Sequence, residues 1–146
     1  MLATLGWIAT VTCAIFAGGA LYASVVEHPG RMACGPPMAV AQFRMSYPRG
    51  AALQAPLAIV GCLSAVGAWL AGGSIGWLVA GLALGLVVPY TLVVMMPTNH
   101  RLLDRQLAPD IPETPQLLRQ WGNLHLVRTA LSLVALTLML HLLAAS

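Results

Sequence analysis

The sequence predicts an all-α integral membrane protein, in which one domain over residues 1–146 forms a bundle of four membrane-spanning helices. Three observations lead to this fold class. The chain is 59% hydrophobic and only 8% charged, whereas soluble domains carry about 25% charged residues. Long stretches contain no charged residue, and the charged residues gather in two segments. Because so few polar side chains could not cover a water-soluble surface, the natural solvent of this chain is the lipid bilayer.

The uncharged stretches place the four helices. Residues 1–26 and 129–146 contain no Asp, Glu, Lys or Arg, and neither do residues 50–100. As one helix the middle stretch would be roughly 75 Å long, well beyond the bilayer's hydrocarbon core of about 30 Å. It therefore crosses the membrane twice, with a turn at Gly72-Gly73-Ser74. The predicted spans lie near residues 2–26, 51–71, 75–97 and 116–144.

The charged residues predict the topology. All of them lie in residues 27–49 and 101–128, which are the first and third connections and the entry to the fourth span. These segments lie on the same side of a four-span protein, and the positive-inside rule makes that side the cytoplasm. We therefore expect the chain in the inner (plasma) membrane with both termini outside. The basic residues are arginines at helix ends, which fits a membrane partner and argues against nucleic acid.

The two charged connections are expected to differ. In the first, Pro36-Pro37 is expected to start a short helix over residues 38–45 that lies on the membrane interface, and Tyr47-Pro48 to end it. The third connection, from Pro97 to Pro115, is expected to be irregular and lid-like because of its prolines.

Small residues four apart predict close helix packing, mainly within the chain, with a homo-oligomer interface as the alternative. The pairs are Ala14 and Gly18, Gly61 and Ala65, and Gly81 and Gly85. Pro89 should bend the third span, since it lacks a backbone donor.

The fourth span carries a stripe of polar and aromatic side chains. Trp121, His125, Arg128 and Ser132 are spaced by four, three and four residues, so they share one helix face. Arg128 lies deep in this span, and a charge at that depth normally faces the bundle interior with a partner. Glu27, at the end of the first span, is the best-placed partner. The simpler interpretations are an interfacial arginine, a structural histidine and an interfacial tryptophan anchor.

Polar residues of three helices should meet at the charged face, as in sites built in bundle cores. The set comprises Glu27, His28, Arg31, Asn99, His125 and Arg128. No HxxxH or ExxH spacing predicts a metal site, so no metal ligand is assigned, although a transition metal stays open as an alternative. The three cysteines form no CxxC motif and predict neither a disulfide framework nor a thiolate metal site.

Nearly the whole chain resembles the anthrone oxygenase family of small four-span membrane proteins. The resemblance rests on residues 16–29, which end in VVEHP, on residues 89–99, which end in PTN, and on WGNLHLVR at residues 121–128. Fungal relatives in that family oxidise polyketide anthrones to anthraquinones with molecular oxygen and no evident cofactor. The resemblance implies a similar oxidation by this chain. The motif residues carried over are His28, Asn99, Trp121, His125 and Arg128.

This chemistry assigns expected roles. His125 is the expected base, because histidine titrates near neutral pH. Arg128 would stabilise the substrate anion, while His28 and Asn99 would orient the substrate. Trp121 and Tyr90 would hold a flat ring, and Glu27 and Arg31 complete the substrate site.

Two other functions remain open from the sequence. The first is a metal-dependent membrane oxidoreductase, which predicts bound metal or colour in the purified protein. The second is a non-enzymatic module that binds a lipid or a quinone, with arginines at an anionic head group and an apolar cleft around the tail. In all three, the partner is a hydrophobic small molecule or lipid.

Overall fold

The computed structural model describes residues 1–145 and is helical along nearly all of them. Four helical segments are long and apolar enough to cross a membrane, so the protein is a multi-pass membrane protein. The first comprises α1 (Leu2–Tyr22), the π-helix η1 (Ala23–Glu27) and α2 (His28–Ala33); the second is α3 (Pro36–Leu70). The third comprises α4 (Ile75–Gly85), α5 (Val87–Tyr90), the π-helix η2 (Thr91–Met95) and α6 (Met96–Leu103); the fourth is α7 (Glu113–Ala144). The predicted fold class is confirmed.

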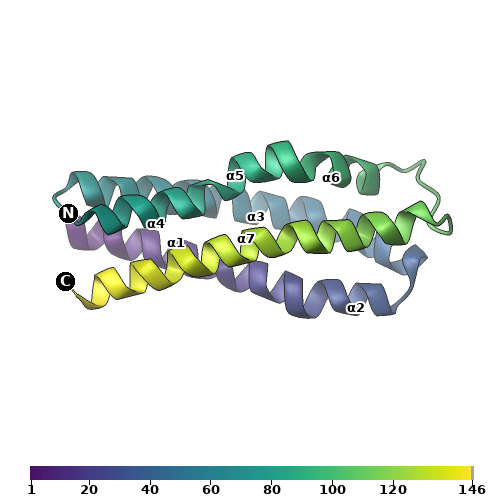
Figure 1. Cartoon of the computed structure of the whole chain (residues 1–146), viewed down its shortest axis with the longest axis horizontal. Coiled ribbons are helices and arrows are strands. Elements are labelled where there is room, and N and C mark those ends of the chain that lie inside the picture. Colours follow the sequence, from purple (N-terminus) through teal and green to yellow (C-terminus); the bar gives the residue numbers. More distant parts are fainter. Residues whose placement is uncertain (146) are drawn as a thin grey trace.

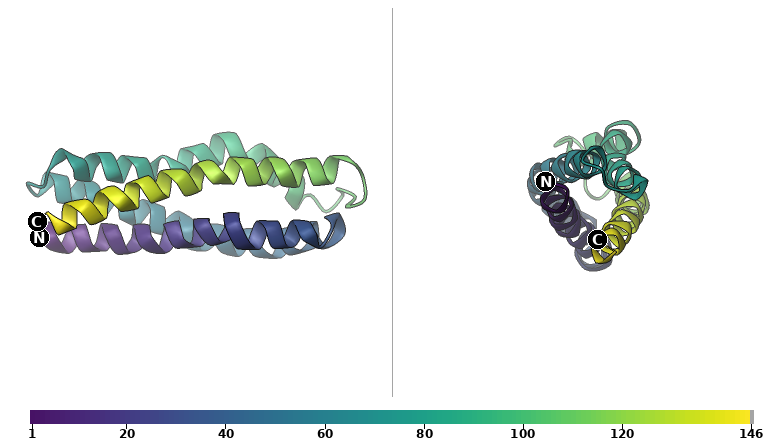
Figure 2. Two further views of the ribbon diagram at one scale, coloured as in Figure 1. Left: turned by 60° about the horizontal axis from the view of Figure 1, so that its bottom comes forward. Right: turned by 90° about the vertical axis from the view of Figure 1, so that its left-hand side faces the viewer.

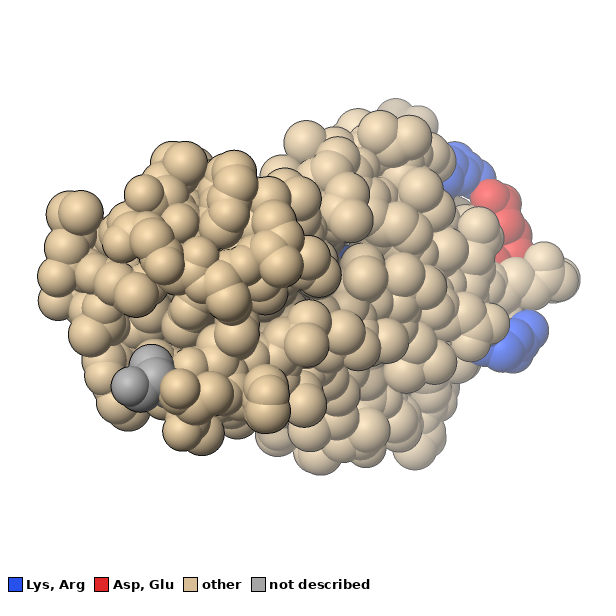
Figure 3. All heavy atoms as spheres, turned by 60° about the vertical axis from the view of Figure 1, so that its left-hand side comes forward, with Lys and Arg blue, Asp and Glu red and all other residues tan. Residues whose placement is uncertain are grey.

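The four segments run antiparallel to their chain neighbours and form a closed ring when viewed along the bundle (Figures 1 and 2). α1 packs on α3 and α7, and α4 packs on the same two helices. The N-terminus and the C-terminal end of α7 lie at one end of the bundle (Figure 1). On the face shown in Figure 3, acidic and basic side chains gather at the opposite end, beside the first and third connections.

The predicted turn between the second and third spans is present at residues 71–74. Gly72 adopts a φ of 94°, which favours glycine, and the amide of Gly73 donates to the Ala68 carbonyl. The bend predicted in the third span is also present. Pro89 lacks the N–H that would bond to the carbonyl of Gly85, and α4 ends at that residue.

The prediction of a separate interfacial helix in the first connection is wrong. Residues 38–45 are the first turns of α3, which continues through Pro48 and Pro56 to Leu70. The connection shrinks to Cys34 and Gly35, with Gly35 at a φ of 81°. Proline is tolerated inside a membrane helix because neighbouring groups satisfy the freed carbonyls, so Tyr47-Pro48 does not end this helix.

The third connection is only partly irregular, because α6 extends the third span to Leu103. The remaining loop comprises residues 104–112. Arg44 of α3 holds it against the bundle through hydrogen bonds. Its Nε donates to the Leu102 carbonyl (3.1 Å), and its Nη2 donates to the carbonyls of Asp104 and Leu107.

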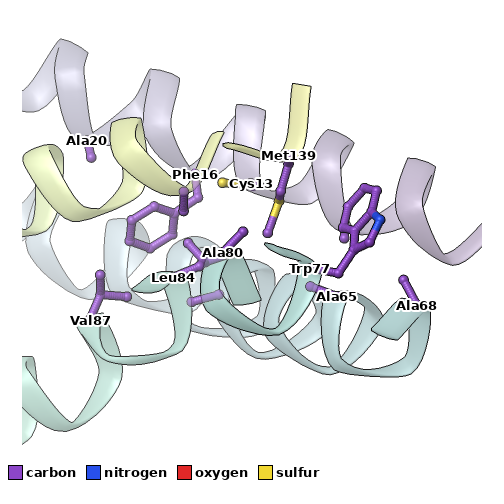
Figure 4. Packing of buried hydrophobic residues seen from close by; sticks show 13 residues of the cluster. Cys13, Phe16, Ala20, Ala65, Ala68, Trp77, Ala80, Leu84, Val87 and Met139 are labelled. Carbon is purple, nitrogen blue, oxygen red and sulfur yellow. The ribbon is translucent and has the colours of Figure 1, made fainter. Parts of the chain in front are cut away.

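Two apolar clusters fill the bundle. The cluster near the termini centres on Phe16, Trp77, Leu84 and Met139 (Figure 4), and the one near the charged end centres on Phe43, Leu102, Leu118 and Trp121. Small residues bring α3 and α4 together, since a Cβ built on Gly81 would lie 2.8 Å from the Cβ of Ala65.

The first predicted small-residue pair does not pack inside the chain. Ala14 and Gly18 are exposed on α1, and a Cβ on Gly18 would meet nothing within 4 Å. This surface points out of the bundle, because α1 turns its other face toward α3 and α7.

Candidate functional site

A cavity of about 320 Å³ lies where the two apolar clusters meet, since members of both line it. Residues of all four spans form its wall. The aromatic and polar lining residues are Phe16, Glu27, Arg31, Phe43, Ser46, Tyr47, Gln54, Thr91, Trp121, His125 and Arg128. Small and apolar residues of α1, η1, α3, α5, η2 and α6 complete it. Its size falls at the lower end of small-molecule sites, which span about 300–1,000 Å³.

His125 is a buried histidine on the cavity wall, with only 3% of its surface exposed. Its ring stacks on Trp121 with the ring centroids 4.7 Å apart. Its Nδ1 lies 3.1 Å from the Ser24 hydroxyl, which lies 2.8 Å from the Thr129 hydroxyl. Thr129 in turn donates to the carbonyl of Ala20 at 3.2 Å. A chain of hydroxyls therefore leads from the histidine to the backbone of α1.

Arg128 is buried as expected, at 8% exposure, but its partner is not Glu27. Its Nη2 donates to Oε1 of Gln54 on α3 at 2.7 Å. Its guanidinium also lies over the Phe16 ring, 5.5 Å from the centroid, and its Nε has no partner among the described residues. The expected pair fails because Glu27 is bonded to two other side chains. A buried cation held by a neutral amide keeps its full charge available to the cavity.

Glu27 belongs to a second polar group on the same wall. Nη2 of Arg31 donates to its carboxylate at 2.8 Å, and Nε2 of Gln42 donates to the same oxygen at 2.7 Å. The Arg31 guanidinium lies over the rings of Phe43 and Trp121, 5.4 and 5.3 Å from their centroids. Nε and Nη1 of Arg31 are buried without a partner within residues 1–145.

Five of the eight predicted site residues line the cavity, namely Glu27, Arg31, Trp121, His125 and Arg128. Asn99, Tyr90 and His28 lie outside the lining. Asn99 is fully buried and donates from Nδ2 to the Tyr47 hydroxyl at 2.8 Å. Tyr90 donates to the Leu124 carbonyl at 3.1 Å. Asn99 is therefore linked to the cavity through the Tyr47 hydroxyl.

His28 lies behind Trp121, with the two ring centroids 5.2 Å apart. It lines a second cavity of about 240 Å³ together with Ser24, Arg119 and Asn123. The α7 backbone approaches it closely at Gly122, where a built Cβ would lie 2.5 Å from its Nε2. His28 thus supports the rear of the cavity wall.

Sequence reasoning missed the cavity residues of α3 and the hydroxyl beside His125. Tyr47 was assigned to a helix end, whereas it lies inside α3 and lines the cavity. Gln54 is polar within an uncharged span, which was an available signal, because polar side chains in such spans usually face another helix. Ser24 offered no such signal.

No group of three or more His, Cys, Asp or Glu side chains that could hold a metal ion occurs within residues 1–145. The side chains present in the cavity are instead two guanidiniums, one carboxylate, one imidazole and several aromatic rings.

The family comparison agrees with the resemblance drawn from the motifs. The model of the family described as anthrone oxygenase matches residues 43–138, which include α7 motif residues and most of the cavity wall. No curated protein and no solved structure shows significant similarity to the chain. Because the match covers well over half of the 146 residues, the chain belongs to the anthrone oxygenase family.

Proposed function

We propose that this protein is a membrane-embedded oxygenase that oxidises a flat phenolic or anthrone-type substrate with molecular oxygen and without a cofactor. The observation that carries this proposal is the placement of His125, a buried imidazole on the wall of a largely apolar cavity that also holds several aromatic rings and two guanidiniums. Such a site offers a base, a surface for a planar ring and positive charge for the anion that the base would form.

The charges of the cavity favour an anion. Arg31 and Arg128 contribute two positive charges and Glu27 one negative charge, so the wall carries a net charge of +1. Arg31 retains two unpartnered N–H-bearing nitrogens after bonding Glu27. In a site shielded from water, these groups would stabilise a phenolate or enolate more strongly than they would in solution.

The hydrogen bonds from His125 through Ser24 to Thr129 support the tautomer of His125 that a base requires. Thr129 donates to a carbonyl, which can only accept, so its hydroxyl oxygen is free to accept from Ser24. The Ser24 oxygen then accepts from Nδ1–H of His125. In this arrangement Nε2 of His125 carries no proton and is the basic nitrogen.

The proposed reaction balances without an external reductant. His125 removes a proton from the activated methylene of the substrate, and the resulting electron-rich anion passes an electron to O₂. Recombination forms a carbon–oxygen bond to a hydroperoxide, and loss of water leaves the quinone carbonyl. Overall, the methylene and O₂ give a carbonyl and one water, and the proton held by His125 leaves with that water.

The setting of the reaction follows the arginine distribution. We propose that the chain lies in the plasma membrane with its charged end in the cytoplasm and its termini outside. The proposed partner is a hydrophobic small molecule within the membrane, with no nucleic acid. A homo-oligomer would use the exposed small residues of α1.

The test is anthrone oxidation by purified protein in detergent, followed by absorbance of the quinone product. We expect His125→Ala to lower the rate by about 10²–10⁴-fold, the usual contribution of a general base. His100→Ala is the matched control, because His100 is exposed and outside the cavity. Full activity of His125→Ala would refute the proposed base.

Metal analysis of the same samples decides between the enzyme alternatives. Stoichiometric metal that is lost in His125→Ala would support a metal-dependent oxidoreductase. Binding of a quinone or lipid that needs Arg128 and not His125, without turnover, would support the non-enzymatic module.

A further inference from the structure

The wall of the cavity includes two large apolar side chains that are also exposed on the outside of the bundle. Leu53 of α3 is 60% exposed and Leu92 of η2 is 59% exposed, yet both line the cavity. Both lie in the stretch of residues 50–100 that carries no Asp, Glu, Lys or Arg. The cavity therefore reaches the surface at a level where the helices face lipid.

The packing of the helices explains this opening. α3 packs along α4 and also contacts α5 and α6, whereas η2 makes few contacts with it among the described residues. The third span bows away from the bundle around α5 and η2 (Figures 1 and 2).

The outer side of the third span near Leu92 is apolar. Leu86, Val93 and Val94 on the third span are 55%, 74% and 43% exposed. Side chains of this kind on a membrane-spanning segment contact acyl chains, because exposing them to water would be unfavourable. The opening beside Leu53 and Leu92 therefore meets the hydrocarbon of the bilayer.

We propose that the substrate enters sideways from the bilayer through a portal between α3 and η2, bounded by Leu53 and Leu92. The substrate class that fits this route is a planar, membrane-dissolved aromatic compound with an acidic group that ends beside the buried guanidiniums. The identity of the substrate rests on the proposed function, but the portal itself does not.

A cysteine inside the cavity tests the route without any substrate. Ser46 lines the cavity and accepts a hydrogen bond from Nη2 of Arg31 at 3.3 Å, so Ser46→Cys places a thiol on the inner wall. The protein is held in lipid nanodiscs, in which both membrane faces meet water. It is treated with N-ethylmaleimide, which partitions into lipid, or with a sulfonated maleimide, which does not. Mass spectrometry of peptides locates the modification, and exposed Cys34 serves as the internal reference for both reagents.

We expect N-ethylmaleimide to modify the Ser46→Cys thiol at least about tenfold faster than the sulfonated reagent does, after each rate is divided by that of Cys34. Adding Leu92→Trp should slow modification by a further factor of about ten, a barrier increase of about 1.4 kcal/mol. Val93→Trp is the matched control, because Val93 adjoins Leu92, is more exposed and does not line the cavity. It should change the rate by less than twofold.

Several results would overturn the portal. Equal modification by the two reagents would show that the cavity opens to water. Equal rates in the Leu92→Trp and Val93→Trp proteins would place the entrance elsewhere. A thiol that reacts only after denaturation would show that the cavity is closed to lipid. Failure of anthrone oxidation would leave the thiol result intact, so the portal and the proposed function are tested separately.

Discussion

Replacing Gly81 by alanine should separate α3 from α4, because the added methyl group has no room. A built Cβ lies 2.8 Å from the Cβ of Ala65, 3.2 Å from the Cys62 carbonyl oxygen and 3.6 Å from the Val66 nitrogen. Favourable contacts between carbon atoms lie at about 3.5–4.0 Å. Two of these partners are backbone atoms and the third is a methyl without rotamers, so the helices themselves must move apart.

The cost follows from that movement. Adding a methyl group to a closely packed interior costs about 1–3 kcal/mol, and a gap of about 0.5–1 Å forfeits a quarter to a half of each contact's attraction. Alanine gains about 1 kcal/mol over glycine in a helix interior, and a variant without the clash measures this gain. Gly18→Ala is that variant, since nothing lies within 4 Å of its built Cβ. Because this gain is common to both variants, we expect Gly81→Ala to be less stable than Gly18→Ala by the packing cost alone, about 1–3 kcal/mol.

The assay is equilibrium unfolding in mixed detergent micelles, followed by loss of helical circular dichroism. Both variants are compared with the unmodified chain in the same lipid and detergent mixture. If Gly81→Ala unfolds at the same denaturant concentration as Gly18→Ala, the close approach of α3 and α4 is not a feature of the folded protein. The same result would undermine the position of α3 along one wall of the cavity.

Two further predictions concern the surroundings of the site. Arg44→Ala should destabilise the protein by about 2 kcal/mol and speed proteolysis within residues 104–112, because it removes three hydrogen bonds to carbonyls; exposed Arg105→Ala should do neither. Gly122→Ala should cost about 1–3 kcal/mol in thermal unfolding through its clash with His28. That cost should vanish when His28→Ala is also present, and a persistent cost would refute the clash.

The fold was predictable because membrane helices follow from long-range composition. Long charge-free stretches, together with a glycine turn, placed the first three spans, and the apolar run after Arg128 placed the fourth. The stripe on α7 was predictable for a similar reason. Trp121, His125, Arg128 and Ser132 share one face of one helix, and all four are buried. Periodicity within a single helix can be read from the sequence alone.

Pairings between helices could not be predicted in the same way. Arg128 meets Gln54 and Asn99 meets Tyr47, at separations of 74 and 52 residues. Which of several polar groups lie at the same depth depends on the rotation of each helix and on small shifts along its axis. Those are set by packing, for which the sequence has no local signal. The predicted helix end at Tyr47-Pro48 was wrong, because rules for proline from soluble helices do not hold in lipid.

The two π-helices explain why a cavity exists between the two apolar clusters. η1 and η2 each follow a tyrosine, contain a Val-Val pair and end two residues before a proline, over residues 22–29 and 90–97. Such proline residues remove the N–H that an α-helix would use four residues back, and in η1 the His28 amide instead bonds the Ala23 carbonyl, five residues back. Each wider turn interrupts regular packing.

Both interruptions line the cavity, η1 through Ala23 and Glu27, and η2 through Thr91 and Leu92. The same two turns give the cavity opposite walls of different character, since η1 contributes the carboxylate that holds Arg31 while η2 contributes the exposed Leu92. The same local feature, a π-helical turn followed by a proline, occurs in the first and third spans. It therefore accounts for both the polar end of the cavity and its opening toward lipid.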